Sequence, residues 1–132
     1  MGERLAIELP AVPERVPAAR GAISRLCERL GIEDVLADDI RLAVTEACTN
    51  AVLHAYEGAR PGRPRTFALE ARLEDDELLV VVRDSGSGVL RPQSGRGGLG
   101  YGLGLMRRLA SSVDVLARPG RGTCVAMRFA LG

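Results

Sequence analysis

A helix predicted near the middle of the chain carries the sequence Thr45-Glu46-Ala47-Cys48-Thr49-Asn50-Ala51-Val52-Leu53-His54. Apolar residues occupy nearly all of its sides, which predicts that the helix is buried against several neighbours. Glu46, Asn50 and His54 interrupt this apolar surface at intervals of four residues and therefore share one face. A buried carboxylate and a buried amide are costly unless each meets a polar partner.

Two interpretations of these polar side chains stay open at this point. Glu46 and Asn50 either face a bound ligand, or they bond neighbouring backbone or lie on a solvated stripe. For His54, a helix-end residue with a polar neighbour is favoured over a metal ligand, because the sequence contains no second histidine.

A second polar feature directly follows an apolar strand expected at Leu78–Arg83. It reads Asp84-Ser85-Gly86-Ser87-Gly88. Glycines at alternate positions allow a sharp turn in which the backbone approaches a flat ligand closely. The aspartate carboxylate could accept a hydrogen bond from an exocyclic amine, although an ordinary turn accounts for the same residues.

A third feature runs from Gly95 to Gly104 and holds six glycines in ten residues. A helix is expected to begin where they end, at Leu103, and to continue to Ala110. A glycine turn that leads into a helix N-terminus presents unpaired backbone amides to an anion such as phosphate. The segment also fits a dinucleotide-binding spacing, but no strand precedes it and no βαβ unit surrounds it. A flexible surface loop remains the alternative.

The rest of the pattern predicts an α/β fold, a two-layer α+β sandwich. Short turns between consecutive strands favour a mostly antiparallel sheet with the helices on one face. Strands are expected at Arg4–Leu9, Thr66–Leu73, Leu78–Arg83, Val113–Ala117 and Thr123–Phe129, and helices at Val16–Leu30, Asp38 or Asp39 to Tyr56, and Leu103–Ala110.

Composition narrows the class of function. The 132 residues fit one domain, residues 1–132, and the net charge of +1 draws the chain to neither nucleic acid nor membrane. All 18 basic residues are arginine, which excludes a Walker A loop and a lysine Schiff base. Three widely spaced cysteines and the lack of a signal peptide or long apolar run predict a cytoplasmic protein.

The three features, in this order and spacing, resemble the ATP-binding domain of the GHKL (histidine-kinase-like ATPase) superfamily. Glu46 to Asn50 is similar to its N box, Asp84 to Gly88 to its G1 box, and Gly100 to Gly104 to its G2 box. Gly122-Thr123 resembles its closing Gly-Thr element. Within the superfamily, residues 45–57 most resemble the bacterial anti-sigma factor serine/threonine kinases.

The resemblance implies a Bergerat-type ATP-binding fold and assigns roles to residues. Glu46 would be the catalytic base, and Asn50 would bind Mg²⁺ as well as ATP. Asp84 would accept a hydrogen bond from the adenine amino group. The residues expected to contact ATP are Asn50, His54, Asp84, Gly86, Gly88, Gly100, Tyr101, Gly102, Leu103, Gly104 and Thr123.

The resemblance therefore implies an ATP-dependent serine/threonine kinase that acts as an anti-sigma factor. Such a protein binds a sigma factor, phosphorylates an anti-anti-sigma antagonist of the STAS type, and forms a homodimer. A non-catalytic module with the same nucleotide pocket, which switches a partner when ATP binds, is the alternative. The short segment between Gly88 and Gly100 implies a small nucleotide lid.

Overall fold

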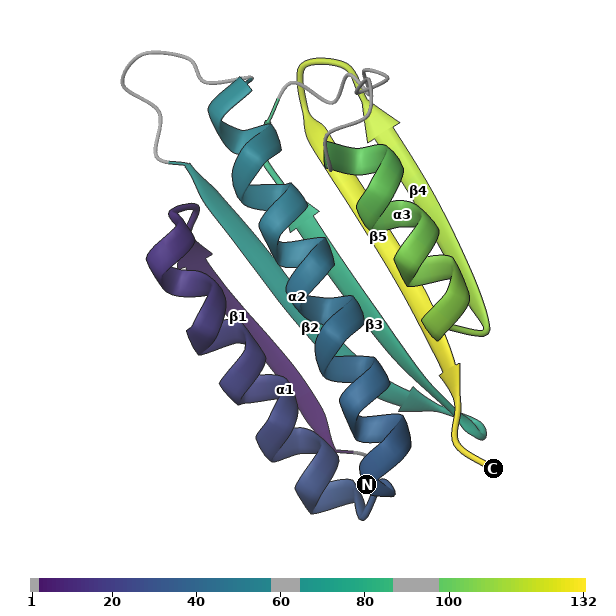
Figure 1. The fold of residues 1–132 in the computed structure, drawn as a ribbon. Helices are drawn as coiled ribbons and strands as arrows, with labels where there is room; N and C mark the ends of the chain where they lie inside the picture. Colours follow the sequence, from purple (N-terminus) through teal and green to yellow (C-terminus); the bar gives the residue numbers. More distant parts are fainter. Residues whose placement is uncertain (1–2, 58–64, 87–97) are drawn as a thin grey trace.

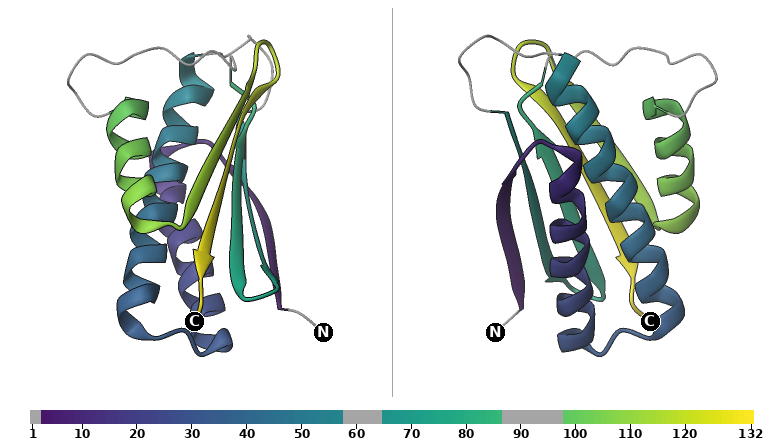
Figure 2. Two further views of the ribbon diagram at one scale, coloured as in Figure 1. Left: turned by 90° about the vertical axis from the view of Figure 1, so that its right-hand side faces the viewer. Right: turned by 60° about the vertical axis from the view of Figure 1, so that its left-hand side comes forward.

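A computed structural model describes residues 3–57, 65–86 and 98–132. Five strands form one sheet, and the helices cover one of its faces (Figures 1 and 2). The elements are β1 (Arg4–Pro10), the 3₁₀ turn η1 (Pro13–Arg15), α1 (Val16–Leu30), α2 (Asp34–Glu57), β2 (Thr66–Glu74), β3 (Glu77–Asp84), α3 (Gly98–Leu109), β4 (Ser112–Arg118) and β5 (Gly122–Ala130).

The strand order across the sheet is β1-β2-β3-β5-β4. The predicted two-layer α/β architecture is confirmed, and each of the four strand pairs in the described chain is antiparallel. The pairing of β3 with β5 sets Asp84 opposite Thr123. These two residues, which are far apart in sequence, thus lie side by side at one end of the sheet.

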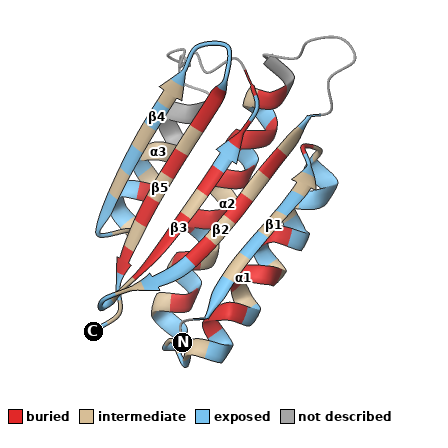
Figure 3. Cartoon of the chain, turned by 180° about the vertical axis from the view of Figure 1, so that it is seen from behind, coloured by how far each residue is buried: buried red, intermediate tan, exposed pale blue. Residues whose placement is uncertain are grey.

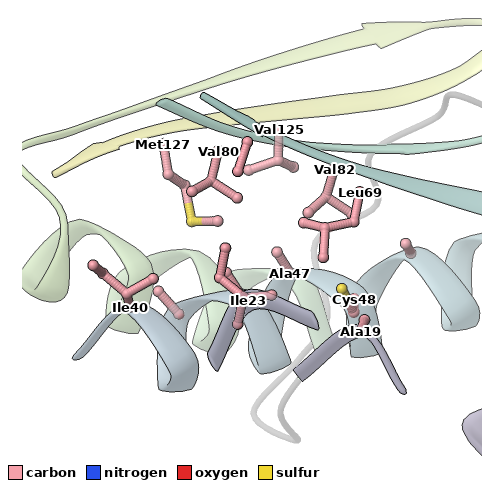
Figure 4. Close-up of a cluster of buried hydrophobic side chains, with 14 of the residues drawn as sticks. Ala19, Ile23, Ile40, Ala47, Cys48, Leu69, Val80, Val82, Val125 and Met127 are labelled. Atoms are coloured by element: carbon pink, nitrogen blue, oxygen red, sulfur yellow. The ribbon is translucent and has the colours of Figure 1, made fainter. Parts of the chain in front are cut away.

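The core lies between the sheet and the helices. Residues of β2, β3 and β5 alternate between this core and the opposite face of the sheet, as the period of two requires. The outer strands β1 and β4 contain no buried residue (Figure 3). Figure 4 shows side chains of the helices meeting those of the sheet, among them Ile23, Ile40, Leu69, Val80 and Met127.

Two helices begin earlier than predicted. Helix α1 ends at Leu30, and Gly31 caps it with a left-handed φ of 67°. The Gly31 amide donates a hydrogen bond to the Glu28 carbonyl. Helix α2 then begins at Asp34, four or five residues before the expected start at Asp38 or Asp39. A short connection is enough, because the left-handed cap at Gly31 reverses the chain direction.

The difference at α3 matters more. This helix begins at Gly98, five residues before the expected start at Leu103, and ends at Leu109. Glycine weakens a helix by about 1 kcal/mol per residue relative to alanine, so propensity alone predicted a loop. Packing against α2 accompanies this helix, and Gly102 leaves room there for the Asn50 side chain.

No helix in the described ranges combines the length and the low charge that crossing a bilayer requires.

Candidate functional site

Helix α2 presents the three predicted polar side chains to different surroundings. Glu46 is partly buried, and within the described residues its carboxylate has no hydrogen bond or ion pair. Asn50 is buried with 4% of its surface exposed. His54, one turn later, lies close to the end of β3. The same helix thus supplies an unpaired acid, a buried amide and an imidazole at successive turns.

Asp84 ends β3 and is held from several directions. Its Oδ1 atom accepts hydrogen bonds from the Gly86 amide at 2.9 Å and from the Thr123 amide at 3.3 Å. Its Oδ2 atom lies 3.4 Å from Nδ1 of His54. These contacts fix the orientation of a carboxylate that is almost fully buried. The carboxylate can accept a further hydrogen bond from a ligand donor placed beside Oδ2.

Asn50 lies against α3. A Cβ atom added to Gly102 would stand 2.6 Å from Nδ2 of Asn50, so only glycine leaves room for this amide. Among the described residues, Nδ2 of Asn50 is a buried side-chain nitrogen without a hydrogen-bond partner. Since a buried donor without a partner costs about 1–3 kcal/mol, this amide points to a bound group.

Glycines at two turns bring the backbone close to this site. A Cβ atom on Gly86 would meet the His54 carbonyl oxygen at 2.3 Å. Gly122 has a φ of 107°, and a Cβ atom there would meet the Asp84 carbonyl oxygen at 1.9 Å. The ends of α2, β3 and the β4–β5 turn are therefore pressed together, and a larger residue at either glycine would separate them.

The donor set fits Mg²⁺ held together with phosphates. The described chain contains no cluster of three or more His, Cys, Asp or Glu side chains able to bind a metal alone. Mg²⁺ favours oxygen ligands and usually retains waters and substrate phosphates rather than an all-protein cage. A half-turn of the Asn50 amide exchanges its nitrogen and oxygen, so the unpartnered position can present an oxygen.

The structure thus brings together Asn50, His54, Asp84, Gly86, Gly102 and Thr123. Thr123 contacts Asp84 through its backbone amide. Gly88 lies outside the described residues, as does most of the segment expected to form the lid.

The remaining predicted ATP contacts lie on α3. Gly100 lies in the first turn of this helix, where backbone amides have no partner within the helix, and Tyr101 directly follows it. Gly102, Leu103 and Gly104 come later in α3. A helix uses the amides beyond its first turn in its own hydrogen bonds, and the contacts of Gly102, Leu103 and Gly104 with ATP stay predictions.

Gly122 was not among the residues predicted to contact ATP, although the structure requires a glycine at this position. Gly122 adopts a positive φ beside Asp84. The sequence carries a signal for it, because Gly122 closes the turn Arg118-Pro119-Gly120-Arg121 immediately before Thr123.

Cys48 has no chemical role in this arrangement. Burial raises the pKa of its thiol to about 12. The side chain faces the core (Figure 4), so it packs there as a small apolar group.

Comparisons with known proteins identify the family of the chain. The sequence profile of the family described as "Histidine kinase-like ATPase domain" matches residues 9–129. Serine-protein kinase RsbW of Bacillus pumilus is 35% identical over 130 residues, which cover 86% of this chain and 78% of that protein. Anti-sigma F factor of Pasteuria penetrans is 30% identical over 136 residues, with 94% and 88% covered.

A solved structure supports the fold. It contains the RsbU and RsbW domains of a protein from Mycobacterium tuberculosis and matches with a TM-score of 0.75. The match covers 98% of this chain and 32% of that one, at 22% sequence identity.

Proposed function

Because the chain belongs to the histidine kinase-like ATPase family, and within it to the anti-sigma factor serine-protein kinases, we propose that it transfers phosphate from ATP to a serine of a STAS-domain antagonist. The arrangement on α2 carries the proposal. Glu46 has no partner among the described residues, Asn50 lies against Gly102 one turn later, and His54 approaches Asp84 one turn beyond.

Asp84 would select adenine. Two backbone amides hold its Oδ1 atom, so the carboxylate is oriented before the base arrives. The Oδ2 atom, fixed in this way, can accept a hydrogen bond from the exocyclic amine of adenine. Guanine has a carbonyl oxygen at the corresponding position and cannot donate there. Orientation in advance lowers the entropy lost when the nucleotide binds.

Asn50 would hold the metal that accompanies ATP. The Asn50 side-chain oxygen would hold Mg²⁺, which would supply positive charge to offset that of the phosphates. Asn50 contributes one oxygen and Gly102 leaves the space for it. The amides in the first turn of α3, that of Gly100 among them, would supply further positive charge for the phosphates.

Glu46 would act as the general base. Its carboxylate accepts the proton of the substrate serine hydroxyl while the serine oxygen forms a bond to the γ-phosphorus. The bond from that phosphorus to the oxygen bridging the β- and γ-phosphates breaks, and ADP leaves. Phosphoryl transfer depends mainly on positioning and charge stabilisation, and a positioned base adds about 10²–10⁴-fold.

A labelled-ATP assay tests the proposal. The chain is incubated with Mg²⁺, radiolabelled ATP and a STAS-domain protein, and the phosphorylated serine is identified by mass spectrometry. We expect Glu46→Gln to lower the rate by about 10²–10⁴-fold while ATP affinity is unchanged. Glu28→Gln, which changes an exposed carboxylate on α1, is the matched control and should transfer phosphate at the wild-type rate.

Two outcomes would contradict the assignment in different ways. Full activity of Glu46→Gln would remove the base. Tight ATP binding by the wild type, together with partner affinity that depends on ATP and no phosphorylated product, would favour the non-catalytic module.

The proposal extends to the chain's partners and setting. A sigma factor is the expected second partner, and the name of the Pasteuria penetrans relative supports it. We further propose that residues 1–132 act as one ATPase domain, that two copies form a dimer, and that the protein works in the cytoplasm. Analytical ultracentrifugation with and without ATP tests the dimer.

A further inference from the structure

Helix α2 carries an apolar stripe on its outer face. The described residues include five exposed large hydrophobic side chains, and three of them are Val35, Leu42 and Leu53 on α2. Their exposed fractions are 72%, 44% and 47%. At 3.6 residues per turn these three, together with Glu46 and Thr49, fall within an arc of about 60°. The described parts of α1 and α3 carry no such exposed side chain.

The threonines around Glu46 add to the apolar character of this surface. The Thr45 hydroxyl donates to the Arg41 carbonyl at 2.8 Å, and the Thr49 hydroxyl donates to the Thr45 carbonyl at 2.8 Å. These hydroxyls are therefore satisfied by the helix itself. Between Leu42 and Leu53, Glu46 is the only charged residue.

We propose that Leu42, Thr49 and Leu53 form the docking surface for the serine-bearing protein substrate. This inference rests on the proposed function, since it takes Glu46 as the base. A serine whose hydroxyl reaches Glu46 must approach the outer face of α2, so the residues beside that serine contact the leucines on either side. The substrate segment it fits is an apolar one, with hydrophobic side chains flanking the serine.

The position of Glu46 identifies the occupant. A second copy of the chain or a sigma factor seated on this stripe would cover the carboxylate that the reaction needs. The stripe also continues directly from the proposed catalytic residue, whereas Leu73 on β2 and Leu116 on β4 lie on strands of the sheet. Surface of this kind gains affinity by losing contact with water when the partner binds.

Steady-state kinetics with protein substrate test the inference. The variants are Leu42→Gln and Leu53→Gln, because glutamine keeps side-chain length and helix propensity. The matched controls are Leu73→Gln and Leu116→Gln, whose leucines are 36% and 51% exposed. The probe is a STAS-domain protein that the wild-type chain phosphorylates, and thermal unfolding checks that each variant is folded.

We expect KM for the STAS-domain protein to rise about fivefold in each α2 variant with kcat unchanged, the pattern of lost substrate binding. The two control variants should keep the wild-type KM. An unchanged KM in the α2 variants, or an equal rise in the controls, overturns the docking surface while leaving the kinase proposal intact. Absence of serine phosphorylation by the wild type overturns both.

Discussion

Substitution of Gly102 by alanine tests the packing that links α2 to α3. The new methyl group would stand 2.6 Å from Nδ2 of Asn50, well inside ordinary contact distance. Overpacking of this kind costs about 1–3 kcal/mol, whereas alanine gains about 1 kcal/mol over glycine in a helix interior. Gly104→Ala should gain the helix propensity without any overpacking cost, because nothing lies within 4 Å of its added Cβ. Chemical unfolding should therefore separate the two variants by about 1–3 kcal/mol.

The same substitution should lower nucleotide affinity only when Mg²⁺ is present. The alanine methyl displaces the Asn50 amide from the position in which it would hold the metal. Displacement of a group that orients a metal ligand costs roughly ten- to a hundredfold in affinity. Calorimetry with ATP and Mg²⁺, and again with ATP and EDTA, measures this difference.

Gly21→Ala is the control for that measurement. It lies on α1, and its Cβ would meet only an arginine side chain at 3.4 Å. Wild-type affinity for Mg²⁺ and ATP in Gly102→Ala, together with a stability equal to that of Gly104→Ala, would refute the close contact between Gly102 and Asn50.

Three further outcomes follow from the same structure. Asp84→Asn should weaken ATP binding by about ten- to a hundredfold, because a hydrogen bond to a charged group contributes about that much affinity. Titration calorimetry should show unchanged affinity for a purine triphosphate that lacks the 6-amino group. Hydrogen bonds from Arg72 and Arg128 lower the pKa of Glu74 in the folded protein. The Glu74 carboxylate therefore stabilises the fold fully above the ordinary glutamate pKa of about 4.3, and this stabilisation is lost as pH falls through the lower pKa of the folded state. Acid unfolding of Glu74→Gln should accordingly depend less steeply on pH in that range. A thiol reagent should label the partly exposed Cys124 before Cys48, because burial raises the pKa of the Cys48 thiol to about 12. Peptide mass spectrometry would show the order of labelling.

The architecture could be predicted because the sequence pattern of most elements agrees with their final environment. Strands β2, β3 and β5 alternate or run apolar, and each turn between paired strands contains short polar residues or glycine. The start of α3 could not be predicted in this way. Its glycines disfavour a helix locally, and the compensating contact with Asn50 joins residues about fifty positions apart.

The candidate site residues could be proposed as a set from the sequence, but the separate environment of each one required the fold. Residues four apart on a helix differ in direction by about 40° around its axis. Side chains at successive intervals of four therefore point toward different neighbouring elements. Glu46 therefore lies toward the outer surface, Asn50 faces α3 and His54 faces the end of β3. The spacing of four residues predicted one shared face. The rotation of about 40° at each step instead places the acid, the amide and the imidazole at three adjoining positions around the helix. Under the proposed function, this rotation would let one helix serve the phosphoryl acceptor, the metal and the adenine side of the same nucleotide.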